Sequence, residues 1–241
     1  MKTFVISLKK SIERRERIQQ TLSKAGIDFT FFDAIDACQE KFKYYDKTAP
    51  KKTTKRFGYI LTKGEVACYA SHYSMWKKCI ELNEPLLVLE DNALFSDHIK
   101  ECFPLFKALM TKYDFIKLGG IHQKNKKNIG VNIIEEVNEK VNLIQYRKRD
   151  SGARGYLITP QAAKKFVENA NEFIEAVDDY MEKPWRHSIK SYCFQPNLVM
   201  RATIPSVIGS NRKNKEKICF KHKILKEFYR VYEKTRYNLY K

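Results

Sequence analysis

Short apolar runs alternate with amphipathic segments along most of the chain. The run KTFVISL at 2–8 predicts a buried strand, because it is apolar, short and bounded by charged residues. The segment after it begins at Ser11, a residue type that favours helix N-caps, carries Ile12, Ile18 and Leu22 on one face, and ends at Gly26, a residue that commonly terminates helices. We therefore predict a strand followed by a helix at 12–25.

The same alternation continues toward the middle of the chain. A second strand and its exit loop are predicted at 27–36, and a polar, lysine-rich loop at 41–57. Thr62 followed by Glu65 has the spacing of a capping box, which predicts that a long helix starts there. The other predicted elements are that helix at 61–82, strands at 86–91, 113–120 and 152–158, and a helix at 160–170.

Strands that alternate with helices predict an α/β fold with a mostly parallel sheet flanked by helices. In such sheets ligands bind beyond the carboxyl ends of the strands. The buried run LLVL at 86–89 leads directly into Glu90 and Asp91 at such an end. This position marks the candidate functional site.

Glu90 and Asp91 have two interpretations. An unpaired buried charge is costly, so the pair either stabilises a loop or helix start, or holds a ligand. Mg²⁺ and Mn²⁺ prefer oxygen ligands and often share them with a substrate diphosphate, whose leaving charge the metal neutralises. The two residues alone do not decide between these interpretations.

The composition narrows the classes of protein. A 43% apolar content supports a real core, and no apolar run approaches the roughly 18 residues of a membrane-spanning helix. The N-terminus lacks the pattern of a signal peptide, which favours a cytoplasmic protein. No two of the six cysteines share a C-x-x-C spacing, which argues against a zinc site and a disulfide framework.

The net charge of +18 predicts an anionic partner. Nucleic acid, an anionic membrane and phosphorylated substrates all satisfy it. No RNA-binding or zinc-finger signature is present, so no nucleic acid is expected, although a basic nucleic-acid-binding module stays the alternative from another class.

Seven strings carry a family resemblance. They are FVISLKKSIERRERI, FFDAIDA, LTKGEVACYASHYSMW, LLVLEDNALF, DFIKLGG, GARGYLITPQAAKKF and AVDDYM, in this order. The series resembles glycosyltransferase family 25, the lipopolysaccharide-type sugar transferases related to collagen galactosyltransferases. The most specific part is G-E-x-x-C-x-x-S-H-x-x-x-W, and the resemblance spans about residues 3–210.

The resemblance implies a GT-A-type nucleotide-sugar fold and an inverting enzyme. The donor would be a UDP-sugar, UDP-galactose first and UDP-glucose next, and the acceptor a lipopolysaccharide- or lipooligosaccharide-type glycolipid or oligosaccharide. A catalytic domain at 1–212 and a basic amphipathic tail at 213–241 are expected. A catalytically silent relative that serves as a scaffold remains an alternative.

The resemblance also assigns a metal site and a donor site. Asp91 and Asn92 would hold Mn²⁺ or Mg²⁺, but Asn92 replaces an acid of the family pattern, which predicts either weaker metal affinity or coordination centred on Asp91. The donor-binding residues would be Ile6, Ser7, Leu8, Arg14, Asp33, Lys63, Gly64, Glu65, Ser71, His72 and Glu90.

Several of these donor residues have ordinary structural readings too. Arg14 belongs to a basic helix face, and Glu65 completes a capping box. His72 fits a core histidine whose hydrogen bonds are made within the protein. Asp33 or Asp36 fits either a contact to the nucleoside or a loop residue that binds backbone N–H groups.

Asp178 or Asp179 would be the catalytic base. An inverting transferase needs one base to accept the proton of the attacking hydroxyl, and the alternative is a plain acidic helix start. Arg154 and Tyr156 would face the acceptor, although Arg154 could equally form a salt bridge.

The tail carries apolar residues at helical spacing among lysines and arginines. Such a helix binds the inner face of the cytoplasmic membrane peripherally, packs back on the domain, or pairs with a second subunit.

Overall fold

The computed structural model describes residues 1–120, 130–204 and 220–240. Its strands are β1 (Lys2–Ser7), β2 (Thr30–Asp33), β3 (Leu86–Glu90), β4 (Ala93–Phe95), β5 (Phe115–Lys117), β6 (Val131–Asn138), β7 (Val141–Tyr146), β8 (Gly155–Ile158), β9 (Tyr192–Gln195) and β10 (Val199–Arg201). Its helices are α1 (Ile12–Ala25), α2 (Pro50–Phe57), α3 (Lys63–Leu82), α4 (Ile99–Cys102), α5 (Phe106–Leu109), α6 (Pro160–Asn169), α7 (Val177–Met181), α8 (Pro184–His187) and α9 (Phe220–Leu239), with 3₁₀ turns η1 (Tyr45–Lys47) and η2 (Phe103–Leu105).

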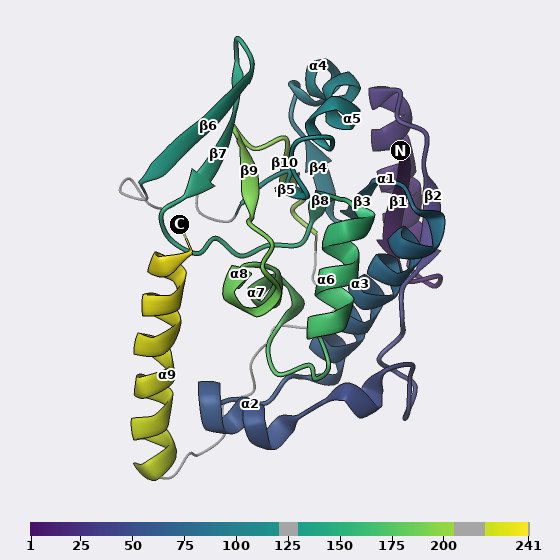
Figure 1. The fold of residues 1–241 in the computed structure, drawn as a ribbon. Helices are drawn as coiled ribbons and strands as arrows, with labels where there is room; N and C mark the ends of the chain where they lie inside the picture. The colour runs from purple at the N-terminus through teal and green to yellow at the C-terminus, as the bar shows by residue number, and fades with distance from the viewer. Residues whose placement is uncertain (121–129, 205–219, 241) are drawn as a thin grey trace.

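The central sheet has the strand order β2-β1-β3-β8-β5-β9-β7-β6. β1 lies parallel to β2 and β3, and β5 lies parallel to β9. β8 runs antiparallel to both β3 and β5, and β7 runs antiparallel to β9 and β6. Because β1, β2 and β3 point the same way, their carboxyl ends meet at one edge of the sheet (Figure 1).

Helices cover both faces of this sheet, because successive strand residues point to opposite sides. Phe4 and Ile6 of β1 join one apolar core with α3 and α6, whereas Val5 joins a second core with α1, α4 and α5. This mixed, largely parallel sheet between two helical layers confirms the predicted α/β, GT-A-type class (Figure 1).

The predicted helix ends are confirmed at three places, whereas the Ser11 side chain makes no cap hydrogen bond and Ile12 is exposed in the first turn of α1. Gly26 ends α1 with φ +68°, a left-handed conformation that glycine adopts without steric cost. Thr62 and Glu65 form both hydrogen bonds of the capping box at the start of α3. Thr159 caps α6, whose first residue is Pro160.

The predicted loop at 41–57 is wrong, because η1 and α2 lie within it. α2 starts at Pro50, whose fixed backbone suits a first helical position, and it buries Thr53. α2 packs along α9, so contacts with a segment far away in the chain stabilise a lysine-rich helix. β6, β7, β9 and β10 were also not predicted, and irregular register between β6 and β7 breaks the alternation that would reveal them.

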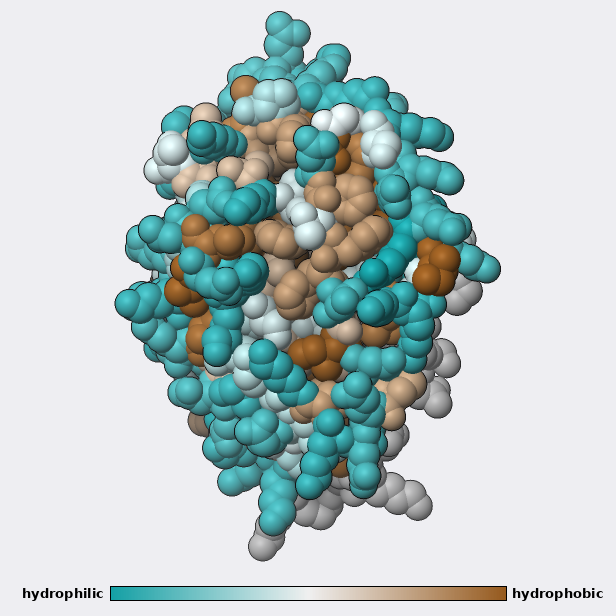
Figure 2. Space-filling view, turned by 90° about the vertical axis from the view of Figure 1, so that its right-hand side faces the viewer, coloured by the Kyte–Doolittle hydropathy of each residue, from teal (hydrophilic) through white to brown (hydrophobic). Residues whose placement is uncertain are grey.

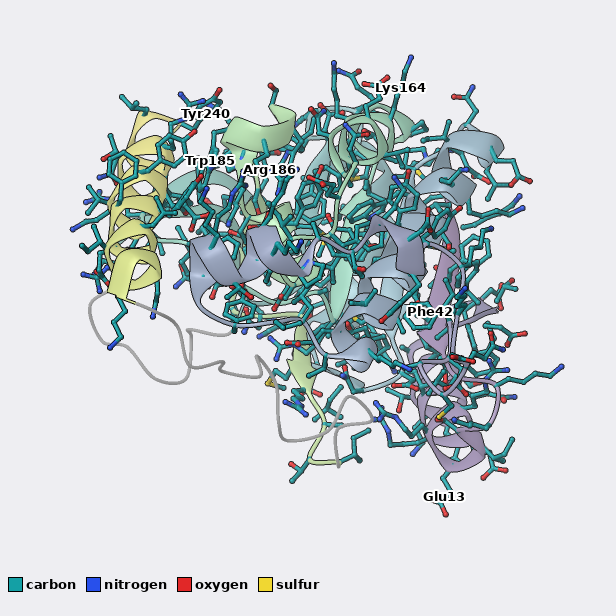
Figure 3. The ribbon with its side chains drawn as sticks, turned by 90° about the horizontal axis from the view of Figure 1, so that it is seen from below. Glu13, Phe42, Lys164, Trp185, Arg186 and Tyr240 are labelled. Atoms are coloured by element: carbon teal, nitrogen blue, oxygen red, sulfur yellow. The ribbon has the colours of Figure 1, made fainter. Side chains whose placement is uncertain are left out.

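One face of α9 packs on the body of the protein. The Tyr237 hydroxyl donates to the Tyr146 carbonyl at 3.1 Å, and the Tyr237 ring contacts Trp185 of α8 edge-on. In the view from below, Trp185 and Arg186 lie on the side of the body that faces α9 (Figure 3). The opposite face of α9 exposes apolar side chains, namely those of Ile224, Phe228, Val231 and Leu239.

The expected boundary between 212 and 213 lies outside the described residues. No described helix combines the length and the apolar character that crossing a bilayer requires. On the side of the molecule that carries α1 and β2, hydrophilic side chains surround a more apolar central strip (Figure 2).

Candidate functional site

A cavity of about 300 Å³ opens where the carboxyl ends of β1 and β3 meet the first turns of α3. Its other walls are the loop 34–38, the segment 152–154 before β8 and the segment 176–178 at the start of α7. The predicted residues that line it are Ile6, Ser7, Leu8, Arg14, Gly64, Glu65, Ser71, His72, Glu90, Asp91, Asn92, Arg154 and Asp178.

The buried Asp91 carboxylate is held by β1 and α1. The Ser7 hydroxyl donates to Asp91 Oδ2 at 2.8 Å, and Arg14 Nη2 lies 2.5 Å from Oδ1. The Arg17 guanidinium donates to the Asp91 carbonyl. Burial raises the pKa of Asp91, while the Arg14 charge and the Ser7 hydrogen bond oppose that rise. Ion pairing with Arg14 thus offsets part of the cost of burying a carboxylate after the strand, and burial remains the larger effect.

A hydrogen-bonded chain runs from the cavity into the core. His72 Nε2 lies 3.3 Å from Glu90 Oε1, and His72 Nδ1 lies 2.9 Å from the Tyr156 hydroxyl, which also accepts from Trp76 Nε1. Burial acts to raise the pKa of Glu90, but the contacts with His72 and Asn92 outweigh it and lower that pKa. His72 and Glu90 therefore form one hydrogen-bonded pair in the wall of the cavity.

Asn92 does more than replace an acid. Its amide Nδ2 donates to Glu90 Oε2 at 3.0 Å, a contact that an aspartate could not make. Its Oδ1 is buried without a hydrogen-bond partner in the described structure. An unsatisfied side-chain oxygen on the residue that follows Asp91 fits a hard cation such as Mn²⁺ or Mg²⁺, with the Arg14 guanidinium as a competitor for Asp91 Oδ1.

The adjacent aspartates of α7 have different surroundings. Asp178 lines the cavity, and its Oδ1 accepts from the Asp179 amide at 2.9 Å. Asp179 is buried, and its Oδ1 accepts from the Ser151 hydroxyl at 2.9 Å and lies 3.4 Å from Arg149 Nη2. Only Asp178 of this pair thus lines the cavity that also contains Asp91.

Besides Asp179, three further predicted residues do not line the cavity. The Asp33 carboxylate is largely exposed and pairs with Arg15 at 2.5 Å. Lys63 is exposed at the start of α3. Tyr156 is completely buried behind His72, so its contact with the cavity is indirect.

Two residues that line the cavity have structural roles. Glu65 Oε2 accepts from the Thr62 amide at 2.9 Å, as the capping box requires. Ser71 Oγ accepts from the Ile35 amide at 2.9 Å and donates to the Ala67 carbonyl at 2.8 Å. Ser71 therefore ties the loop 34–38 to α3 and shapes that wall.

Four chemically active residues of the cavity were not predicted from the sequence, namely Lys10, Cys38, Cys68 and Arg201, and Asp36 was predicted only as an alternative to Asp33. Lys10 pairs with Asp36 at 2.6 Å, and this contact lowers the pKa of Asp36 to about 2. Asp36 and Cys68 stand inside the strings that carry the resemblance, which was a usable signal. Arg201 had none, because its strand was not predicted.

The fold and the cavity define an α/β protein of the GT-A type with an acidic strand end and a cationic rim. The family model described as glycosyltransferase family 25 (LPS biosynthesis protein) matches residues 1–181. The chain therefore belongs to glycosyltransferase family 25, a family of sugar-transferring enzymes.

Relatives come from bacterial and animal proteins. The chain is 29% identical over 175 residues to the lipooligosaccharide biosynthesis protein lic2B of Haemophilus influenzae, covering 67% of this chain and 60% of that protein. It is 30% identical over 201 residues to procollagen galactosyltransferase 1-A of Xenopus laevis, covering 78% of this chain and 32% of that protein. The match thus spans less than two thirds of each relative.

One solved structure that matches this chain is the crystal structure of a glycosyltransferase involved in the glycosylation of the major capsid of PBCV-1. The TM-score is 0.44 at 8% identity, and the match covers 96% of this chain and all of that one.

Proposed function

We propose that this protein transfers a hexose, galactose in the first instance, from a UDP-sugar to a hydroxyl of a lipopolysaccharide- or lipooligosaccharide-type glycan, with inversion at the anomeric carbon. The observation that carries the proposal is the shared cavity of Asp91 and Asp178, which come from separate walls. Membership in the family and the two named relatives support the class of donor and acceptor.

The nucleotide end of the donor fits the wall built by β1 and the loop 34–38. Backbone groups at 6–8 and the Asp36 side chain offer hydrogen-bonding partners to a uridine. Lys10, Arg14 and Arg201 line the same cavity and supply positive charge for a diphosphate. Arginines that are already positioned stabilise the charge of a leaving group without reorganising at the moment of reaction.

A divalent metal would add to this neutralisation. Mn²⁺ or Mg²⁺ would be held by Asp91 and Asn92 and, when bound, would offset charge on the departing diphosphate. Glu90 lies within hydrogen-bonding distance of His72 and Asn92 and forms part of the donor wall.

Asp178 is the base of the proposed reaction. Its carboxylate accepts the proton of the acceptor hydroxyl while the hydroxyl oxygen forms a bond to the anomeric carbon. The bond from that carbon to the diphosphate oxygen breaks on the opposite side, and UDP leaves. Arg154, which lines the cavity beside Gly152 and Ala153, contacts the acceptor in this arrangement.

The type of acceptor also indicates where in the cell the transfer takes place. A glycolipid acceptor sits at a membrane surface, and the exposed apolar face of α9 lies among lysines and arginines. That combination suits peripheral contact with an anionic membrane, and we place the reaction at its cytoplasmic face.

Donor transfer by the purified chain tests the proposal. UDP-galactose and UDP-glucose are each incubated with Mn²⁺ and a short lipooligosaccharide-type acceptor, and UDP release and product are measured. The anomeric configuration of the product, read by NMR, should be opposite to that of the donor. UDP-sugar affinity without any transfer would instead support the scaffold alternative, and retained configuration would contradict inversion.

A further inference from the structure

A soft ligand set lies in the wall of the cavity, and no step above uses its sulfur. Cys68, His72 and Glu90 each offer one ligand atom, and these three atoms lie within 4.8 Å of one another. Cys68 and His72 are four residues apart on α3, so their side chains leave the same face of the helix. Glu90 meets them from the end of β3.

The spacing of these atoms suits a small tetrahedral ion. Zinc binds histidine nitrogen at about 2.0–2.1 Å and carboxylate oxygen at about 2.0–2.2 Å, which sets two such ligands roughly 3.4 Å apart. His72 Nε2 and Glu90 Oε1 are already 3.3 Å apart. The sulfur must approach by about 1 Å at most, within reach of a small rotation of the Cys68 side chain.

Both polar ligands are oriented by neighbours, as metal ligands usually are. The Tyr156 oxygen lies 2.9 Å from His72 Nδ1 and has a second lone pair beside the one that Trp76 uses, so it can accept the Nδ1 proton. That tautomer leaves Nε2 free to bind a metal. Asn92 Nδ2 holds Glu90 Oε2, which turns Oε1 toward His72.

One coordination position would stay open. Cys68, His72 and Glu90 all line the cavity of about 300 Å³, so a molecule in the cavity can supply a fourth ligand. Three protein ligands and one open position are the arrangement of zinc sites that meet a ligand, whereas closed structural sites use four. The missing C-x-x-C spacing therefore does not bear on this cluster.

We propose that Cys68, His72 and Glu90 form a binding site for Zn²⁺ or a similar borderline metal ion, distinct in chemistry from an oxygen site at Asp91 and Asn92. A thiolate and an imidazole select zinc over Mg²⁺ and Mn²⁺, which favour oxygen ligands. This site does not depend on the proposed sugar transfer, and its test needs no activity.

Co²⁺ reports directly on sulfur coordination. The full-length protein titrated with Co²⁺ should develop an intense thiolate-to-cobalt absorption band that saturates at one ion per chain. Cys68→Ser should abolish that band and weaken Zn²⁺ binding, measured against a chromophoric chelator, by more than about 100-fold. Cys38→Ser is the matched control, because Cys38 lines the same cavity outside the cluster and its loss should leave the band intact.

Two further measurements keep the test decisive. Tyr156→Phe should weaken Zn²⁺ binding by about 10–100-fold while the cobalt–sulfur band persists, since only an orienting partner is lost. X-ray absorption of the unmodified protein with one equivalent of Zn²⁺ should give one sulfur at about 2.3 Å together with nitrogen or oxygen neighbours. A shell without sulfur, or a cobalt band unchanged in Cys68→Ser, would overturn the site.

Discussion

The Arg14 guanidinium pairs with the Asp91 carboxylate at 2.5 Å, with both side chains largely buried. The contact joins α1 to the end of β3, across 77 positions of the chain. It means that the protein itself neutralises the acid that a divalent cation would use, so that guanidinium and cation compete for the same oxygen.

The first prediction follows from this competition. Arg14→Gln should tighten Mn²⁺ binding by about tenfold, which corresponds to ~1.4 kcal/mol, because the competing charge is gone. Asp91→Asn should reduce Mn²⁺ binding and sugar transfer together. Calorimetric titration with Mn²⁺ measures both variants. Arg147→Gln is the control, since Arg147 hydrogen-bonds to Asn132 of β6, away from the cavity; equal Mn²⁺ affinity in all three variants would contradict the competition.

The second prediction separates the two aspartates of α7. Asp178→Asn removes a base that lines the cavity, so the rate of transfer should fall by about 10²–10⁴-fold with little change in UDP-donor affinity. Asp179→Asn should instead lower the melting temperature, because Asp179 is buried against Ser151 and Arg149. Steady-state kinetics and thermal unfolding of both variants distinguish the roles. Parental turnover in Asp178→Asn would move the base elsewhere.

The third prediction concerns the docking of α9. Glu233 forms an ion pair with Lys183, which is almost fully buried, and lies 3.6 Å from Arg149. Glu233→Ala should lower the free energy of unfolding by about 1–3 kcal/mol, because it leaves buried cations with fewer partners. Glu227 is exposed on α9, where it pairs with Arg230 within the same helix, and it offers the control. Glu227→Ala should change urea unfolding by less than ~0.5 kcal/mol, and a loss equal to that of Glu233→Ala would refute the special role of Glu233.

The fourth prediction is a pH dependence of stability. Burial lowers the pKa of His187 to about 3 from an ordinary value of 6.5. The neutral ring is satisfied on both sides, with Nε2 at 3.2 Å from the Tyr180 carbonyl and Nδ1 accepting from the Ile189 amide. Below pH 6.5 only the unfolded chain takes up this proton. The contribution of neutral His187 to the free energy of unfolding is thus complete above pH 6.5. It is lost as the pH falls toward 3, at up to ~1.4 kcal/mol per pH unit.

His187→Gln tests this assignment. Glutamine can donate to the Tyr180 carbonyl and accept from Ile189 without titrating. The difference in unfolding free energy between parent and variant should stay constant above pH 6.5 and shrink as the pH falls. A constant difference from pH 7 to pH 4 would assign the acid sensitivity to other groups.

The fifth prediction concerns the outer face of α9. Phe228 and Val231 are 66% and 61% exposed. Replacing both by serine should weaken binding to anionic vesicles at least about tenfold in a sedimentation assay, since burial of each apolar side chain contributes roughly 1.5–3 kcal/mol. Ile133→Ser removes an equally exposed apolar residue on β6 and should leave vesicle binding unchanged. Equal binding by the double variant would exclude this face as the contact.

Much of the fold could be predicted from the residues alone, because it depends on local periodicity. Strand and helix spacing indicated the α/β class, and short-range cap chemistry located the starts of α3 and α6. The position of Glu90 and Asp91 beyond a buried strand indicated the site, since every parallel strand delivers its carboxyl end to one edge of the sheet.

Tertiary contacts decided the rest. The partner of Asp91 is an arginine 77 positions away, and neighbours from another segment, Arg149 and Ser151, separate the surroundings of Asp178 and Asp179. α2 forms in a lysine-rich segment because it packs against α9, a contact that its own residues do not encode. The environment of a charged side chain and the stability of a marginal helix depend on residues that long-range packing brings into contact with them. Those residues cannot be identified from the local sequence pattern.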